Sequence, residues 1–170
     1  MARVIILDGH SRTGKSTLAK KISERLQCPL FGGRAEKPKK FMTNGMYYLG
    51  AAFYEFNAVH GCNTAVCDRS FISDCMWAEV HGRLSFVPAG LVDSFLKTND
   101  VVHICFLSSY KEYLKALMNS KDGFRYTPEQ WDKIADSMLA LNSRIGGLVV
   151  GGVNFEANEA KVMDYIESIA

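Results

Sequence analysis

One run of eight residues, 9–16, has the spacing of a loop that binds phosphate. It reads Gly-x-x-x-x-Gly-Lys-Ser and ends in Lys15 and Ser16. Glycines allow backbone N–H groups to turn towards an anion, and a helix that begins at the loop adds the positive end of its dipole. Lys15 is expected to contact the β- and γ-phosphates of a nucleoside triphosphate, and the Ser16 hydroxyl to bind Mg²⁺. The pattern therefore predicts ATP and Mg²⁺ as cofactors.

The residues predicted to bind the triphosphate are those of the loop and of the helix start that follows it. They are Gly9, His10, Ser11, Arg12, Thr13, Gly14, Lys15, Ser16 and Thr17. Asp8 directly precedes them at the end of an apolar segment. Two interpretations of Asp8 remain open: it orders the loop by hydrogen bonding, or it acts near magnesium.

A second pair with chemical potential, Asp68 and Arg69, also follows an apolar segment and precedes a helical pattern. A carboxylate at the tip of a strand beside the phosphate loop can hold hydrated Mg²⁺. A neighbouring guanidinium can bind a phosphate or the acceptor oxygen. The sequence predicts Ser16 and Asp68 as metal ligands and Lys15, Asp68 and Arg69 as catalytic residues. The structural alternative for Asp68 and Arg69 is a charged pair at a helix start.

The lysine-rich stretch 34–40 supplies candidates for an acceptor site. Glu36 either accepts or orients the proton of an acceptor hydroxyl, or it is an ordinary surface residue. Positioning would be its larger role, because phosphoryl transfer through a loose transition state needs little base strength. The cations of the stretch either bind a phosphate on the acceptor or form a solvated loop; they are Arg34, Lys37, Lys39 and Lys40. The predicted substrate-binding residues are thus Arg34, Glu36, Lys37 and Arg69.

The elements that must position these residues alternate along the chain. Apolar runs at 4–7, 29–31, 65–67, 101–107 and 148–150 predict strands covered on both faces. Helical spacing follows the loop through Leu18, Ile22 and Leu26, and a second helix is expected to bury Met46, Leu49, Phe53 and Phe56. Helix starts are predicted at Ser109 and Thr127, and a last helix over 162–169. This alternation predicts βαβ units, a parallel sheet and an α/β fold.

Bulk composition limits the classes of function. The chain has 170 residues, 48% of them apolar, and 20 basic against 18 acidic side chains. This length fits a single domain, residues 1–170. A net charge of +2 disfavours a dedicated nucleic-acid-binding protein. No apolar run approaches the ~20 residues needed to cross a bilayer, and the five cysteines form no C-x-x-C pair. We therefore expect a cytoplasmic protein with reduced thiols and no membrane partner.

The motifs together resemble those of the thymidylate kinase and deoxynucleoside kinase superfamily of P-loop kinases. The run 9–16 matches the first family motif, and Asp68-Arg69-Ser70 with Ser73 is similar to the motif after the third strand. The segment 35–38, which contains Glu36, looks like the acidic-proline element after the second strand. The segment 119–127 looks like the lid, with Lys121 and Arg125 as its basic residues. The resemblance implies a five-stranded parallel sheet in a three-layer sandwich and a catalytic role for Arg125.

The function predicted from this resemblance is ATP-dependent transfer of the γ-phosphoryl group to a deoxynucleoside or nucleoside monophosphate. One alternative is a deoxynucleoside kinase that phosphorylates a free 5′-hydroxyl group. Further alternatives are a DNA or polynucleotide kinase and a P-loop module that binds a nucleotide without catalysis. No arginine lies between Arg34 and Arg69, where thymidylate kinases carry one that meets the base. The acceptor base therefore stays open, as does a homodimer.

Overall fold

The computed structural model describes residues 1–32, 44–118, 126–152 and 154–169. Its centre is a sheet of five parallel strands in the order β2-β3-β1-β4-β5. The strands are β1 (Ala2–Gly9), β2 (Leu30–Gly32), β3 (Thr64–Asp68), β4 (Asn99–Leu107) and β5 (Gly147–Gly151). The α/β class and the positions of all five predicted strands are confirmed, but the edge strand β2 is not covered on both faces, since Leu30 is 40% exposed. The predicted residues Arg34, Glu36, Lys37, Lys39, Lys40, Lys121 and Arg125 lie outside the described residues.

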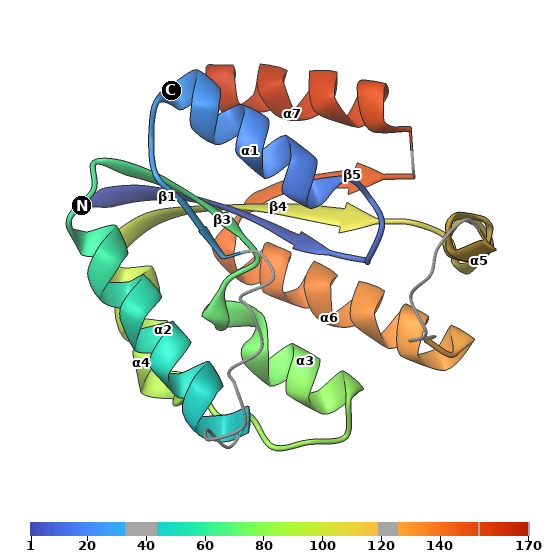
Figure 1. The fold of residues 1–170 in the computed structure, drawn as a ribbon, viewed down its shortest axis with the longest axis horizontal. Coiled ribbons are helices and arrows are strands. Elements are labelled where there is room, and N and C mark those ends of the chain that lie inside the picture. The colour runs from blue at the N-terminus through green and yellow to red at the C-terminus, as the bar shows by residue number, and fades with distance from the viewer. Residues whose placement is uncertain (33–43, 119–125, 153, 170) are drawn as a thin grey trace.

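Helices cover both faces of the sheet, so the predicted three-layer sandwich is confirmed (Figure 1). One face carries α1 (Lys15–Leu26) and α7 (Phe155–Ile169). The other carries α2 (Asn44–His60), α3 (Asp74–Val80), α4 (Ala89–Thr98) and α6 (Pro128–Ile145), with the short 3₁₀ helix η1 (Phe71–Ser73) between β3 and α3. The remaining helix, α5 (Tyr110–Met118), lies beyond the end of β4. In the described part of the chain, no helix is long and apolar enough to cross a membrane.

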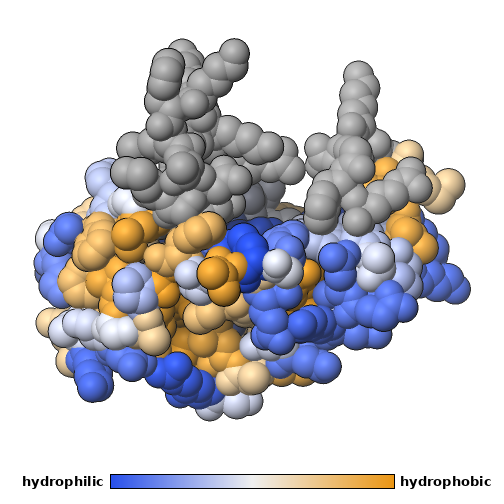
Figure 2. All heavy atoms as spheres, turned by 90° about the horizontal axis from the view of Figure 1, so that it is seen from below, coloured by the Kyte–Doolittle hydropathy of each residue, from blue (hydrophilic) through white to orange (hydrophobic). Residues whose placement is uncertain are grey.

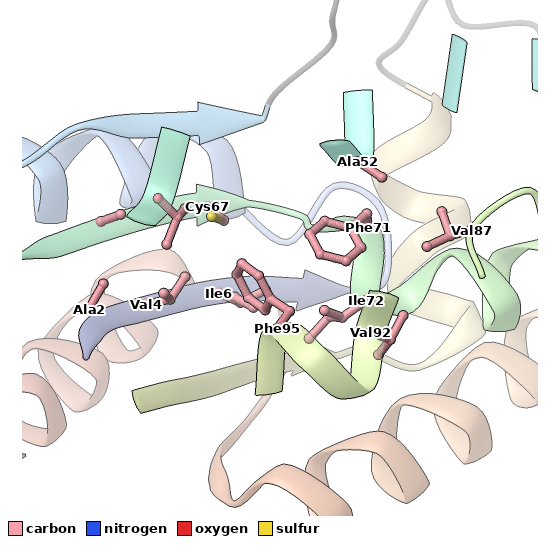
Figure 3. Close-up of a cluster of buried hydrophobic side chains, with 12 residues drawn as sticks. Ala2, Val4, Ile6, Ala52, Cys67, Phe71, Ile72, Val87, Val92 and Phe95 are labelled. Carbon is pink, nitrogen blue, oxygen red and sulfur yellow. The ribbon is translucent and has the colours of Figure 1, made fainter. Parts of the chain in front are cut away.

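The central strand β1 is buried on both faces, which explains the unbroken apolar run at its residues 4–7. Ile5 and Leu7 pack under α1 and α7, whereas Val4 and Ile6 face α2 and α4. Figure 3 shows the cluster that contains Val4 and Ile6, in which Phe95 of α4 lies over β1. Burial of such side chains is the main force that holds the layers together, at roughly 25 cal/mol for each Å² of apolar surface.

The buried face of α2 differs from the sequence prediction. Ala52 and Val59 are fully buried and Phe56 packs against their cluster, whereas Phe53, predicted to be buried, is 47% exposed. The buried stripe thus runs one helical position away from the predicted one.

Figure 2 shows the face formed by α2, α4, α3 and α6, where hydrophobic side chains gather over α2 and α4 and hydrophilic ones over α6.

A buried aspartate at the start of α3, Asp74, holds the loop between α3 and α4. Arg83 Nη2 donates to Asp74 Oδ1 at 2.6 Å, while Ser85 Oγ and the Phe86 N–H donate to Oδ2 at 2.8 and 3.1 Å. Burial opposes ionisation of Asp74, but the hydrogen bonds from Arg83 and Ser85 outweigh burial, and the net effect lowers the pKa of the carboxyl group. Asp74 is therefore a structural residue of this loop.

We expect Asp74→Ala to lower the free energy of unfolding at pH 7 by about 3 kcal/mol, because three hydrogen bonds to a buried carboxylate are lost. Since the folded pKa is lowered, this stability is present above the unfolded pKa and is lost as pH falls through the folded value. Urea denaturation at pH 7 and at pH 3 measures both effects. The control Asp93→Ala removes an exposed ion pair with Arg144 and should cost less than about 1 kcal/mol. Equal losses in the two variants at pH 7 would contradict the assignment.

Candidate active site

The phosphate-loop motif connects β1 to α1, as predicted, and both of its glycines are required by their surroundings. Gly9 has φ +116°, and a Cβ there would lie 2.2 Å from the main-chain oxygen of Phe106. Gly14 has φ +83°, and a Cβ there would lie 2.5 Å from the ring of Phe155 at the start of α7. Side chains at these two positions would push the loop away from β4 and α7. The glycines of the motif thus set the path of the loop.

Lys15 lies at the start of α1 and folds back against the loop. Its side chain is buried, at 5% exposure, and its Nζ donates to the carbonyl oxygen of His10 and, at 3.1 Å, to Thr13 Oγ1. Thr13 Oγ1 in turn donates to the His10 carbonyl at 3.0 Å. The His10 carbonyl oxygen therefore accepts hydrogen bonds from the side chains of both Thr13 and Lys15.

Three charged side chains act on Lys15: Asp8, Asp68 and Arg69. Burial lowers the pKa of Lys15 to about 8, and the nearby Arg69 guanidinium also lowers it, whereas Asp8 and Asp68 act in the opposite direction. A strongly perturbed, charged group in such surroundings is typical of a functional site. The structure thus brings together Lys15, Asp68 and Arg69, the three predicted catalytic residues that it describes.

Asp68 is the last residue of β3 and Arg69 follows it, so both lie beside the phosphate loop that follows β1. Asp68 pairs with Leu7 at the end of β3, and the Arg69 N–H donates to the Leu7 carbonyl at 2.9 Å. Arg69 then adopts the left-handed region with φ +68°, an uncommon conformation for a residue other than glycine. Its guanidinium lies 4.7 Å from the ring centroid of Trp77 on α3. The cation–π contact stabilises this side chain in one position.

The donor set available for a cation consists of hard oxygens. Asp68 is a buried carboxylate, and Ser16 is exposed on the first turn of α1. In the described ranges, no group of three or more His, Cys, Asp or Glu side chains could hold a metal ion. One carboxylate and one hydroxyl fit Mg²⁺, which keeps several waters and is shared with substrate phosphates in such sites. They do not form the closed cage of a structural metal.

Asp8 contacts the phosphate loop directly. It is fully buried, and its Oδ1 accepts a hydrogen bond from the Gly9 N–H at 2.8 Å. This contact agrees with the first of the two sequence interpretations, in which Asp8 orders the loop.

Glu55 on α2 is a site residue that sequence reasoning missed. It accepts hydrogen bonds from Ser70 Oγ and from the Phe71 N–H, and it lies beside the Cys67 thiol. Burial raises the pKa of Glu55 to about 7. The signal in the sequence is a single carboxylate on the buried face of α2, one turn from Ala52 and from Val59. Glu55 fixes the residue after Arg69 and so supports the turn that Arg69 makes.

We expect Glu55→Gln to raise the free energy of unfolding at pH 8 by an amount on the order of 1 kcal/mol. A carboxyl group whose pKa is raised on folding destabilises the folded state as pH rises from its usual value near 4.5 to about 7, and the cost stays constant above that. Each pKa unit corresponds to ~1.4 kcal/mol, reduced here because the side chain is partly exposed. Denaturation of both proteins from pH 4 to 8 measures the effect. If the free energy of unfolding of the wild type rises relative to that of Glu55→Gln as pH increases from 4 to 8, the prediction is wrong.

The fold occurs in solved structures of nucleotide-binding enzymes. Deoxyadenosine kinase from M. mycoides, with dCMP and dCDP bound, aligns with a TM-score of 0.67 and 17% identity over 97% of this chain and 99% of its own. Thymidylate kinase from Candida albicans gives 0.62 and 14% over 98% and 92%. The YorR protein from Bacillus subtilis, in complex with phosphorylated GDP, gives 0.66 and 19% over 96% and 95%. The chain has the P-loop nucleotide kinase fold.

Sequence comparison adds no relative to these structural matches. Neither a protein-family model nor a curated protein matches the chain. At identities of 14–19% the structural matches establish the fold, and the chemistry has to be argued from the residues.

Proposed function

We propose that this P-loop nucleotide kinase fold carries an ATP-dependent kinase that transfers the γ-phosphoryl group to a nucleoside or deoxynucleoside monophosphate. The observation that carries the proposal is the meeting of Lys15, Asp68 and Arg69 at the carboxyl ends of β1 and β3. In open parallel sheets, this edge is where ligands bind. A binding module without catalysis would need the phosphate loop but has no use for an arginine held beside it.

In the proposed reaction, different residues of the chain bind ATP, hold the metal ion and contact the transferred phosphoryl group. Backbone N–H groups of residues 9–16 and the start of α1 surround the phosphates of ATP, and Lys15 exchanges its contacts with the loop for phosphate oxygens. Ser16 and Asp68 would hold Mg²⁺, which would supply positive charge to neutralise the phosphates. Arg69 directs its guanidinium at the phosphate of the acceptor or at the group in transfer. Most of the rate enhancement then comes from positioning and from electrostatic stabilisation of the transition state.

A deoxynucleoside kinase is the second candidate function. A monophosphate acceptor brings roughly two negative charges at neutral pH, which a closed site has to pair. Arg69 and the sequence candidates Arg34 and Lys37 are cations for that purpose. The structural matches are compatible with either acceptor. One is named a deoxyadenosine kinase, which suggests a nucleoside acceptor, and another a thymidylate kinase, which suggests a monophosphate acceptor.

A panel of acceptors separates these functions. The protein is incubated with ATP, Mg²⁺ and one acceptor at a time: deoxynucleosides, their monophosphates, or an oligonucleotide with a 5′-hydroxyl. We expect ADP to form with at least one monophosphate. Turnover of free nucleosides alone would support the second candidate, and turnover of the oligonucleotide alone a polynucleotide kinase. Tight binding of ATP without ADP from any acceptor would refute a kinase and support the binding module.

A further inference from the structure

An aromatic stack joins the phosphate loop to two helices that come much later in the chain. The Trp131 ring of α6 lies between the His10 ring, at 3.9 Å and 24°, and the Tyr113 ring of α5, at 4.2 Å and 24°. The three side chains are 1–2% exposed. Trp131 is set at the start of α6 by Thr127, whose capping box fixes the first turn of the helix. The loop is therefore packed on a helix start whose position is itself well defined.

The His10 ring is also held at both of its nitrogens. The Ser108 N–H donates to Nδ1 at 2.9 Å, so Nδ1 is an acceptor and the proton must lie on Nε2. Nε2 then donates to the Trp131 carbonyl oxygen at 2.9 Å. The Trp131 indole N–H donates to the Ser108 carbonyl at 2.7 Å and closes the arrangement. Rotation or protonation of the ring would break at least one of these hydrogen bonds.

What the ring fixes is the main chain of His10, and this main chain serves the phosphate-binding groups. The His10 N–H donates to the Phe106 carbonyl at 2.8 Å. The His10 carbonyl accepts from Thr13 Oγ1 and from Lys15 Nζ. The location of His10 therefore decides where Thr13 and Lys15 lie before a nucleotide arrives.

We propose that Trp131 is a positioning residue for phosphate binding, which acts through His10 on Lys15 and Thr13. The inference rests on the proposed function of the loop in binding ATP. A preformed loop avoids the cost of ordering when the ligand binds, and this cost appears as lost affinity when the support is removed. The contacts above join Trp131 to His10, Ser108 and Tyr113 and not to the proposed magnesium ligand Asp68 or to Arg69, so its effect should fall on ATP affinity.

The competing explanation is that Trp131 is ordinary core. The chain offers a matched control in Met138, a fully buried residue of the same helix that packs with Cys105 and Ile134. Both Trp131→Leu and Met138→Ala should destabilise the fold by a few kcal/mol. Only Trp131→Leu should weaken binding if the proposal holds.

The experiment measures Kd for ATP and for inorganic tripolyphosphate by calorimetry, at a temperature where every variant is folded. We expect Trp131→Leu to weaken both ligands by about tenfold, the equivalent of ~1.4 kcal/mol. Trp131→Phe keeps a ring on His10 and should recover most of the loss, and Met138→Ala should stay within about twofold. In a His10→Leu background, Trp131→Leu should add less than about twofold, because the route through His10 is already gone. Full additivity of the two changes would overturn the proposal.

A second measurement keeps this inference separate from the proposed function. Backbone amide exchange over residues 9–16 is compared in the ligand-free proteins. We expect at least tenfold faster exchange in Trp131→Leu than in Met138→Ala. Wild-type protein that binds neither ATP nor tripolyphosphate would defeat the proposed function, and faster exchange in Trp131→Leu alone would then still support the positioning role. Unchanged exchange in Trp131→Leu would overturn that role even if ATP binds tightly.

Discussion

Lys15→Ala is expected to lower kcat/KM for ATP by roughly 10³-fold, the scale seen when one preorganised donor to transition-state charge is removed. Lys15 supplies a buried ammonium group at the end of the loop, and alanine supplies no charge there. The fold should survive. Burial lowers the pKa of Lys15 to about 8, so below that pH the folded state holds a charge that the unfolded state accommodates more easily. The melting temperature at pH 7 should therefore stay the same or rise.

Steady-state kinetics and thermal denaturation check the two parts of this prediction. Lys20→Ala is the matched control, because Lys20 lies on the same helix in an exposed pair with Glu24. Its activity should stay within about twofold of the wild type, as for other surface substitutions. Near-normal turnover in Lys15→Ala would show that residues 9–16 do not bind the reacting phosphates. A large fall in its melting temperature would mean that Lys15 mainly stabilises the loop.

Asp68→Asn should lower kcat by roughly 10²-fold at a low Mg²⁺ concentration, since an amide is a poorer ligand than a carboxylate for a hard cation. Because the defect lies in metal affinity, a higher Mg²⁺ concentration should restore part of the rate. The measurement is kcat for ADP formation, with ATP and the acceptor at saturating concentrations, over a series of Mg²⁺ concentrations.

Asp100→Asn serves as the control for charge. Asp100 is an exposed carboxylate at the opposite end of the sheet, paired with Arg3 at 2.8 Å. Its Mg²⁺ dependence should match that of the wild type. If Asp68→Asn loses activity to the same extent at every Mg²⁺ concentration, Asp68 is not a metal ligand.

Much of this fold could be predicted because its signals are local. Residues 4–7 of β1 are all apolar because both faces of the strand are buried, and the glycines at 9 and 14 stand where a Cβ would strike β4 and α7. The α6 start was visible as a capping box around Thr127. Each of these features depends on a few consecutive residues and on rules that need no knowledge of the neighbouring elements.

The rest depends on which elements become neighbours. His10 and Trp131 are 121 positions apart and meet only because α6 packs beside the end of β4, next to β1. Glu55 could be noticed as a carboxylate among apolar residues, but its partner Ser70 is supplied by the turn after β3. On α2, Phe53 and Phe56 stand three positions apart and fit one helical stripe, but the buried stripe runs through Ala52, Phe56 and Val59 and leaves Phe53 47% exposed. Periodicity alone does not decide between two such stripes.

Transfer of label from γ-labelled ATP to nucleoside monophosphates tests the central claim most directly. We predict that wild-type protein with Mg²⁺ forms a labelled nucleoside diphosphate from at least one monophosphate. Lys15→Ala at the same concentration should form none above background, while Lys20→Ala forms as much as the wild type. The opposite result, tight binding of ATP and Mg²⁺ with no labelled product from any monophosphate, nucleoside or 5′-hydroxyl oligonucleotide, would contradict the assignment of a kinase.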